Sequence, residues 1–221
     1  MWKWDYVYSL LPELMSAFRV TLTATLCGFL VASLLGLALA VAYRSRFAAV
    51  RMTVRSFVEF VRSTPLLVQV FFLYYSLPML TPFSLSAFTT GVIGLGLHYS
   101  TYMSEVYRSG IDAVPRGQWE AASALNLTKA KTWLKVILPQ AIPPVIPVMG
   151  NYLIVIFKET PILSAITLVE LLLTAKNAAS VSYRVFEPYT IVGVLFLLVS
   201  LVLSALVRAV ETRLNGRFVQ R

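Results

Sequence analysis

The stretch VTLTATLCGFLVASLLGLALAVAY, at residues 20–43, contains no charged residue and lies between Arg19 and Arg44. As a helix these 24 residues would extend about 36 Å, which is enough to cross the hydrocarbon core of a bilayer. The whole chain of 221 residues has the same character, because 58% are hydrophobic and only 13% are charged. An ordinary soluble domain carries about 25% charged residues. The sequence therefore predicts an integral membrane protein.

Further uncharged runs predict four more spans. Residues 63–104 are uncharged and are interrupted near Pro78 and Pro82, which favours two helices separated by a turn. Four prolines lie within residues 136–157, so a regular helix is expected to begin only late in that run. The predicted fold is all-α, with about five transmembrane helices in one domain covering residues 1–221. The expected spans are 20–43, 57–78, 86–108, 143–160 and 188–208.

The basic residues predict the orientation of these spans. Most of the Lys and Arg residues form three clusters, after the first span, between the third and fourth spans, and at the end of the chain. These are Arg44, Arg46, Arg51 and Arg55; Arg108, Arg116, Lys129, Lys131 and Lys135; and Arg208, Arg213, Arg217 and Arg221. Because cytoplasmic loops are enriched in Lys and Arg, the N-terminus is expected outside and the C-terminus in the cytoplasm. This topology accounts for the net charge of +9 without a nucleic-acid partner.

Several classes of function are excluded by residues that the sequence lacks. One cysteine, Cys27, and one histidine, His98, supply neither an internal disulfide nor a histidine-built metal site. A nucleophile with a nearby base cannot be assembled from them, so a membrane enzyme is a distant alternative and no catalytic residue is assigned. The sequence also lacks the G-x-x-x-x-G-K-[ST] loop that cradles phosphates, so ATP is not expected to bind to this chain.

Small residues recur every four positions in the first span, at Gly28, Ala32, Gly36 and Ala40. Such a stripe lets another helix approach closely, which predicts a packing face. The alternative is that small residues are simply common in spans.

Charged residues at membrane depth are costly and therefore indicate candidate functional positions. Glu59 and Arg62 are three residues apart and either pair to hold the helix in register or contact a ligand. After Lys158, residues 162–174 are too short to cross, which predicts a discontinuous helix lining a pathway; the alternative is an interfacial helix with Lys158 snorkelling. His98 is expected to be a hydrogen-bonded packing residue rather than a proton relay. The candidate substrate pathway comprises Glu59, Arg62, Thr64, Gln69, Glu105, Lys158, Glu159 and Thr160.

Residues 109–142 are expected to form a cytoplasmic connection built of two short helices with a sharp corner. Pro115 suits a helix start, Asn126 suits a left-handed C-terminal cap, and Thr128 suits the N-cap of the second helix. The second helix is expected to end at Pro139. The first helix is rich in small residues and presents Glu120, so it is suited to enter a groove on another protein.

These residues resemble the membrane permeases of bacterial ABC importers for polar amino acids. The string EAASALN at residues 120–126, followed by VILPQA at 136–141, is similar to their cytoplasmic signature E-A-A-x-x-x-G…I-x-L-P, with Asn126 in place of glycine. EFVRSTPLLVQ at 59–69 resembles their E-x-x-R-G-T-P-L-L-V-Q segment, and KETPIL at 158–163 resembles K-D-T-S-L. The resemblance assigns coupling to an ATPase to Gly117, Glu120, Ala121, Ala122, Asn126, Leu138 and Pro139.

The resemblance implies a type I ABC importer permease in the bacterial cytoplasmic (inner) membrane. Its implied partners are two cytoplasmic ATPase subunits that bind ATP and Mg, a second permease subunit that is identical or paralogous, an external solute-binding protein and membrane lipids. The implied solute is a polar amino acid or a similar zwitterion, such as ectoine or an opine. The rival hypothesis is a self-sufficient ion-coupled transporter or channel, which would not require the shape of the connection at 109–142.

Overall fold

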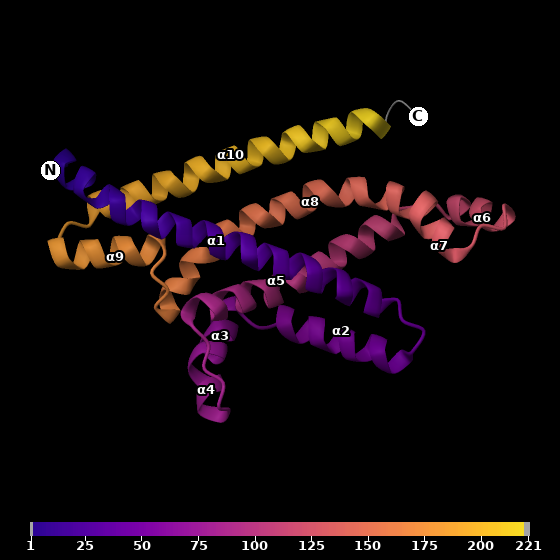
Figure 1. Cartoon of the computed structure of the whole chain (residues 1–221), viewed down its shortest axis with the longest axis horizontal. Coiled ribbons are helices and arrows are strands. Elements are labelled where there is room, and N and C mark those ends of the chain that lie inside the picture. Colours follow the sequence, from indigo (N-terminus) through magenta and orange to yellow (C-terminus); the bar gives the residue numbers. More distant parts are fainter. Residues whose placement is uncertain (1, 219–221) are drawn as a thin grey trace.

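The structure, a computed structural model, describes residues 2–218, with side chains for residues 2–214. This part of the chain is helical and contains no strand, which confirms the predicted all-α fold (Figure 1). Arg221 and the side chain of Arg217 lie outside the described part. The elements are α1 (Trp4–Tyr43), α2 (Ala48–Arg62), α3 (Leu66–Phe71), the π-helix η1 (Phe72–Ser76), α4 (Leu77–Leu80), α5 (Ala87–Asp112), α6 (Arg116–Ala124), α7 (Lys129–Lys131), the π-helix η2 (Thr132–Ile137), α8 (Leu138–Glu159), the 3-10 helix η3 (Thr160–Ile166), α9 (Leu171–Ser182) and α10 (Phe186–Phe218).

Helix α1 contains the whole predicted first span but begins at Trp4, well before residue 20. Its early part buries Leu10, Leu14 and Ala17 against Leu171 of α9 and Val192 of α10. The spacing of these three residues places them on one helical face. Packing against two other helices therefore extends α1 beyond the length that a bilayer requires.

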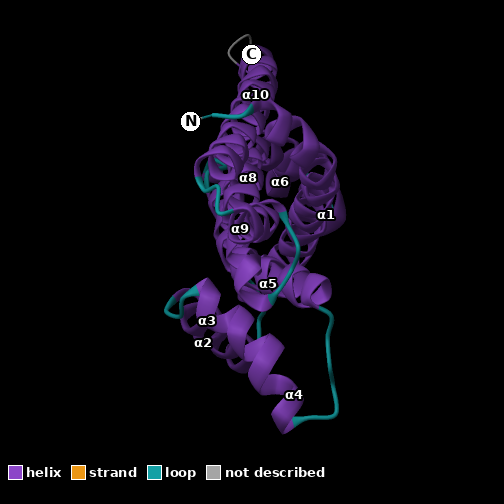
Figure 2. Cartoon of the chain, turned by 90° about the vertical axis from the view of Figure 1, so that its left-hand side faces the viewer, coloured by secondary structure: helices purple, strands orange, loops and turns teal. Residues whose placement is uncertain are grey.

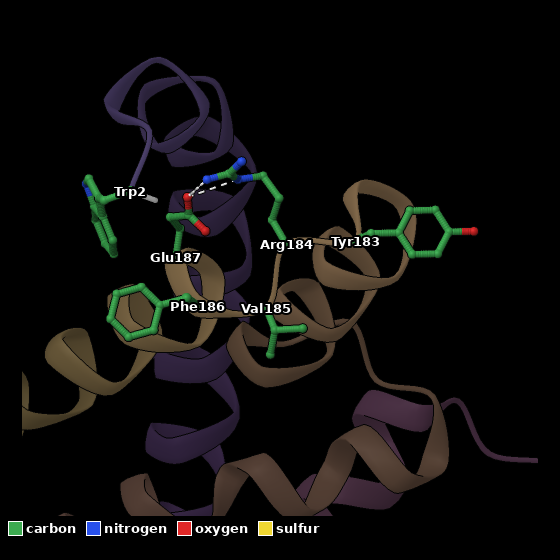
Figure 3. A pocket seen from close by; sticks show the side chains of 6 residues that line it. All are labelled: Trp2, Tyr183, Arg184, Val185, Phe186 and Glu187. Carbon is green, nitrogen blue, oxygen red and sulfur yellow. Dashed lines mark hydrogen bonds and ion pairs between the residues drawn. The ribbon is translucent and has the colours of Figure 1, made fainter.

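A polar clasp also fixes the beginning of the chain against the turn between α9 and α10. Nε and Nη2 of Arg184 donate to Oε1 of Glu187, and the backbone N–H of Lys3 donates to the same oxygen over 3.2 Å. The ring of Trp2 meets Phe186 edge-on at 5.7 Å between centroids. Figure 3 shows Glu187 between these aromatic rings and Arg184, whereas Tyr183 points away. The N-terminus and the start of α10 are thus held together.

The small-residue stripe of α1 is a packing face, as predicted. Gly28, Ala32, Gly36 and Ala40 are all buried. A Cβ placed on Gly36 would lie 2.5 Å from the Cβ of Met103 and 2.9 Å from the carbonyl oxygen of Ser100, both on α5. Only a residue without a side chain allows this approach of α5 to α1.

The prediction of one helix at 57–78 is wrong. The chain forms α2, breaks at residues 63–65, and continues through α3, η1 and α4 at an angle of 101° to α2. Pro65 has no N–H to donate back into α2 and disfavours a helical conformation of Thr64, so α2 stops there. Figure 2 shows α3 and α4 directed away from the bundle that contains α1, α5, α8 and α9.

The expectation that the proline-rich run delays the next helix is also wrong. Helix α8 begins at Leu138 and continues through Pro143, Pro144 and Pro147 to Glu159. Pro139 directly follows the wider π-helix η2, so its missing N–H falls where the hydrogen-bond pattern changes from π-helical to α-helical. The predicted end of the preceding helix at Pro139 therefore does not occur, and the helical path runs on into the bundle.

Within the described residues, three helical segments are long and apolar enough to cross a membrane, and the bent pair of α2 with residues 66–80 would be a fourth. Helix α5, at the predicted span 86–108, is long enough but is not among them. Several of its polar residues are shielded by the bundle, because Thr90, Ser100, Thr101 and Ser104 are buried. Five crossings therefore remain a prediction.

Candidate functional site

The predicted residues form two separate groups, the coupling residues at α6 and the start of α8, and most of the pathway residues around Arg62. Helices α6 and α7, the α1–α2 turn and the end of α10 lie at one end, and the N-terminus and α9 lie at the other (Figure 1). The described parts of the three basic clusters therefore gather at a single end.

Helix α6 is held at this end by one of its faces. Ala122 is buried, and the rings of Trp119 and Trp133 meet edge-on at 5.2 Å between centroids. The side-chain amide of Gln140 in α8 donates to the side-chain oxygen of Gln118 over 3.2 Å. Beneath them, Val114, Ile137 and Ala141 form a small buried cluster. These contacts fix the direction of α6 relative to α8.

The corner after α6 has the conformation that the sequence predicts. Asn126 adopts a φ of 49°, in the left-handed region. The N–H of Leu127 donates to the carbonyl of Ala122, and the N–H of Asn126 donates to that of Ser123. This pair of bonds is a Schellman motif, which usually places glycine where Asn126 stands. The hydroxyl of Thr128 then accepts from the N–H of Lys131, as predicted for an N-cap.

The opposite face of α6 has no cover within the described residues. Gly117, Glu120 and Ala121 are exposed, and a Cβ on Gly117 would meet nothing within 4 Å. Leu125 is 74% exposed. Glu120 makes no ion pair with any described residue. Of the remaining predicted coupling residues, Pro139 is exposed and Leu138 is half-buried at the start of α8. The result is a rigid helix with small side chains around one carboxylate.

The second group centres on Arg62, at the end of α2, whose side chain reaches α5. Nη2 of Arg62 donates to the carbonyl of Thr101 over 2.8 Å, and its guanidinium lies 4.7 Å from the centroid of the Tyr102 ring. Nη1 lies 3.9 Å from Oε2 of Glu105, and Glu105 also pairs with Arg108 at 3.2 Å. Among the described residues Glu59 makes no ion pair, so the Glu59–Arg62 pair, one of the two alternatives, does not form. Arg62 turns to α5 because a carboxylate, a carbonyl and an aromatic face are all available there.

Gln69 braces the break between α2 and α3. Its amide nitrogen lies 2.7 Å from the carbonyl oxygen of Val61 and 2.7 Å from the hydroxyl oxygen of Thr64. The carbonyl of Val61 needs a partner because Pro65, four residues further on, has no N–H to donate to it. The amide oxygen of Gln69 lies 3.2 Å from Nδ1 of His98 in α5. The expected hydrogen-bonded role of His98 is thus present, and Thr64 and Gln69 hold the backbone beside Arg62.

A cluster of three tyrosines, Tyr99 and Tyr102 of α5 with Tyr152 of α8, completes this region. The ring centroids lie 6.0 Å apart for Tyr99 and Tyr102, 5.9 Å for Tyr102 and Tyr152, and 6.2 Å for Tyr99 and Tyr152. None of the three is among the predicted pathway residues, and Tyr152 gives no signal in the sequence because it is a lone tyrosine in an apolar run. The guanidinium of Arg62 and the tyrosine cluster together offer an anion-binding group beside aromatic faces.

The last candidates lie at the end of α8 and do not join the Arg62 group by any hydrogen bond or ion pair among the described residues. Lys158 is exposed and Glu159 is half-buried. Thr160 is buried and its hydroxyl donates to the carbonyl of Phe157 over 2.7 Å. Here the helix tightens into η3, which ends at Ile166 and is followed by its C-cap Thr167 with a φ of 65°. Contrary to the prediction, the helical path therefore does not break directly after Lys158; it tightens there and breaks only after Ile166, before α9.

Comparison with known proteins gives consistent matches. A family model described as binding-protein-dependent transport system inner membrane component matches residues 32–216. A probable amino-acid ABC transporter permease of Sinorhizobium fredii is 46% identical over 97% of this chain and 92% of its own length. An arginine transport system permease of Bacillus subtilis is 31% identical over 93% of this chain and 94% of its own. The crystal structure of an amino acid ABC transporter with histidines contains a chain that superposes with a TM-score of 0.91 at 35% identity, covering 96% of this chain and 99% of that one. A chain of the MetNI methionine ABC transporter superposes with a TM-score of 0.71 at 18% identity, covering 91% of this chain and 98% of that one, and supports the fold.

Proposed function

This chain belongs to the family of binding-protein-dependent transport system inner membrane components, and we propose that it is the permease subunit of an ATP-driven importer of amino acids. The relatives with amino-acid transporter names match over nearly the whole chain, and one solved amino acid ABC transporter shares its fold at 35% identity. The observation that carries the proposal is α6, a rigid exposed helix with a single carboxylate at the basic end of the molecule.

The basic end is the cytoplasmic end in this proposal, and the N-terminus lies outside. The supporting observation is the gathering of the α1–α2 turn, the α6–α7 region and the end of α10 at one end (Figure 1). Positively charged loops are retained on the cytoplasmic side during insertion. The membrane is the bacterial inner membrane.

The exposed face of α6 docks into a groove of a separate ATPase subunit, which binds ATP and Mg. Support comes from the small side chains of Gly117 and Ala121, which allow close approach, and from Glu120, which is available for a charge-assisted hydrogen bond. The fixed contacts of Trp119 with Trp133 would pass a displacement of α6 to α8. This role needs two ATPase subunits, because a second permease, identical or paralogous, forms the other half of the path.

The solute path passes the Arg62 group, in the proposal. A guanidinium suits the carboxylate of an amino acid, and tyrosine faces attract its ammonium group. This pairing favours a polar amino acid or another compact zwitterion, including ectoine or an opine, delivered by an external solute-binding protein. Lys158, Glu159 and Thr160 line the outer part of the same path.

Transport by the reconstituted complex tests the proposal. The chain is placed in vesicles with an ATPase subunit and a solute-binding protein that co-purify with it, and uptake of labelled arginine, glutamine and ectoine is measured. We expect uptake that requires ATP and both partners. Accumulation by vesicles that contain this chain alone, driven by a proton or sodium gradient, would contradict it and favour the ion-coupled carrier.

A further inference from the structure

A large apolar groove lies away from the Arg62 group, between the end of α1, the second half of α5 and the first half of α8. It encloses a cavity of about 1020 Å³. Its walls include Leu37 and Val41 of α1 and Ile142 and Met149 of α8, and Trp133 closes one side. Val41 is 66% exposed and Ile142 is 47% exposed, so the groove is open to the surroundings of the bundle.

One end of the groove is polar and strongly basic. Arg44 and Ser45, at the α1–α2 turn, form its rim. Nη1 of Arg51 donates to the carbonyl of Ser45 over 2.8 Å and to that of Arg46 over 3.1 Å, which brings a second guanidinium to the rim. Arg46 and Arg55 are exposed nearby in the sequence. The basic side chains that follow α1 therefore include two that are structurally fixed at the mouth of an apolar groove.

A single acidic residue makes an ion pair at this rim among the described residues. Nη1 of Arg44 lies 2.8 Å from Oδ1 of Asp112, the last residue of α5. Both side chains remain partly exposed, at 39% and 57%. The pair orients Arg44 across the groove mouth, and the charge of Arg51 is left without an acidic partner in the described part of the chain.

The basic mouth and the apolar walls together indicate what kind of molecule the groove binds. The walls on α1 and α8 belong to two of the segments that are long and apolar enough to span a membrane, where the surrounding solvent is lipid hydrocarbon. Arginine clusters directly beyond the end of a span attract anionic lipids, by about fivefold in binding for each residue near the surface. A helix of a protein partner would satisfy the apolar walls but gives no reason for guanidinium groups at the mouth.

We propose that this groove binds an anionic phospholipid of the cytoplasmic leaflet, with an acyl chain along α1 and α8 and the phosphate between Arg44 and Arg51. The proposal rests on the orientation argued above and on no property of the transported solute. The bound lipid fills the gap between α1 and α8 and ties the α1–α2 turn to the membrane surface.

Native mass spectrometry of the full-length chain, incubated with equal amounts of phosphatidylglycerol and phosphatidylcholine, tests the proposal. We expect retained phosphatidylglycerol in excess, and a loss of that preference by about fivefold in Arg44→Gln. Arg208→Gln is the matched control, because it removes the same charge from an exposed position at the cytoplasmic end of α10. Asp112→Asn breaks the same ion pair but leaves Arg44, so it should retain or increase the preference.

The acyl part of the site needs a separate variant. Ile142→Trp places a larger ring in the groove and should reduce retention of both lipids without changing the oligomeric state measured by light scattering. Equal retention of the two lipids by the unmodified chain would overturn the proposal, as would equal effects of Arg44→Gln and Arg208→Gln. If Ile142→Trp instead dissociates an oligomer and leaves lipid retention unchanged, the groove is occupied by a second copy of the chain and the lipid site is refuted.

Discussion

At the scale of single residues, Arg62 connects the break in the bundle with the candidate path. Its guanidinium joins the end of α2 to Thr101, Tyr102 and Glu105 of α5. Its Nε is buried and has no partner among the described residues, so the side chain has unused hydrogen-bonding capacity. The Arg62 side chain is 30% exposed, so a solute carboxylate would approach the exposed part of the guanidinium and not the buried Nε.

Arg62→Gln tests this role. It removes the charge that would attract a carboxylate, and we expect uptake by the reconstituted complex to fall about tenfold. The amount of folded complex, measured by size-exclusion chromatography, should change little. Arg55→Gln, at an exposed position of the same helix, is the control and should transport normally. If uptake and folded protein fall in parallel, Arg62 is structural.

At the scale of elements, the approach of α1 to α5 depends on glycine. Gly36 faces the Met103 side chain and the Ser100 carbonyl, and the latter is backbone that cannot rotate away. The two helices therefore need a position without Cβ, whereas Gly193 in α10 has nothing within 4 Å of an added Cβ.

Gly36→Ala should destabilise the chain by about 1–3 kcal/mol through overpacking. Gly193→Ala is the matched control and should be neutral or slightly stabilising, since alanine favours a helix over glycine. The melting temperature in detergent measures both. Equal melting temperatures for the two variants would mean that α1 and α5 are not packed as closely as described.

Helix α6 is the element proposed to dock on the ATPase, because its inner face packs against the rest of the chain and its outer face is exposed. Glu120→Lys should leave the fold unchanged, as Glu120 makes no ion pair among the described residues. It should uncouple ATP hydrolysis from uptake by reversing the charge at the docking surface. The measurement is ATPase stimulation by solute-loaded binding protein. Normal stimulation and normal uptake in the variant would refute the coupling role.

At the scale of the whole molecule, charge is segregated between the two ends. The basic clusters lie with α6 and the end of α10, and the clasp of Arg184 and Glu187 lies at the other end with the N-terminus. Such segregation fits a chain held in one orientation across a membrane.

Single-cysteine labelling tests this orientation. With Cys27 replaced by serine, Lys176→Cys should react with a membrane-impermeant maleimide added to spheroplasts. Lys129→Cys should react only after the surrounding membrane is permeabilised. Both positions are exposed in the structure, so access to reagent decides the outcome. The reverse pattern would invert the proposed topology.

The sequence by itself determined the membrane environment, the helical class and the local chemistry of the α6 corner. Long uncharged runs have one physical solution in a bilayer, and Asn126 and Thr128 act through the backbone of their own turn, so no distant contact is needed. The signature segments likewise pointed to the family that the comparisons support.

Only the tertiary structure decided how helices break and which side chains meet. Pro65 ends α2, and Gln69 donates to the Val61 carbonyl that this end leaves unpaired. The prolines of α8 instead lie within a continuous helix. Sequence patterns alone do not distinguish these two outcomes. Arg62 pairs with Glu105 and not with Glu59 because α2 packs against α5. Tyr152 contacts Tyr99 and Tyr102 because α8 packs against α5, and these residues are far apart in the chain. Spacing along a chain specifies local geometry, but contacts between elements depend on packing that no single segment encodes.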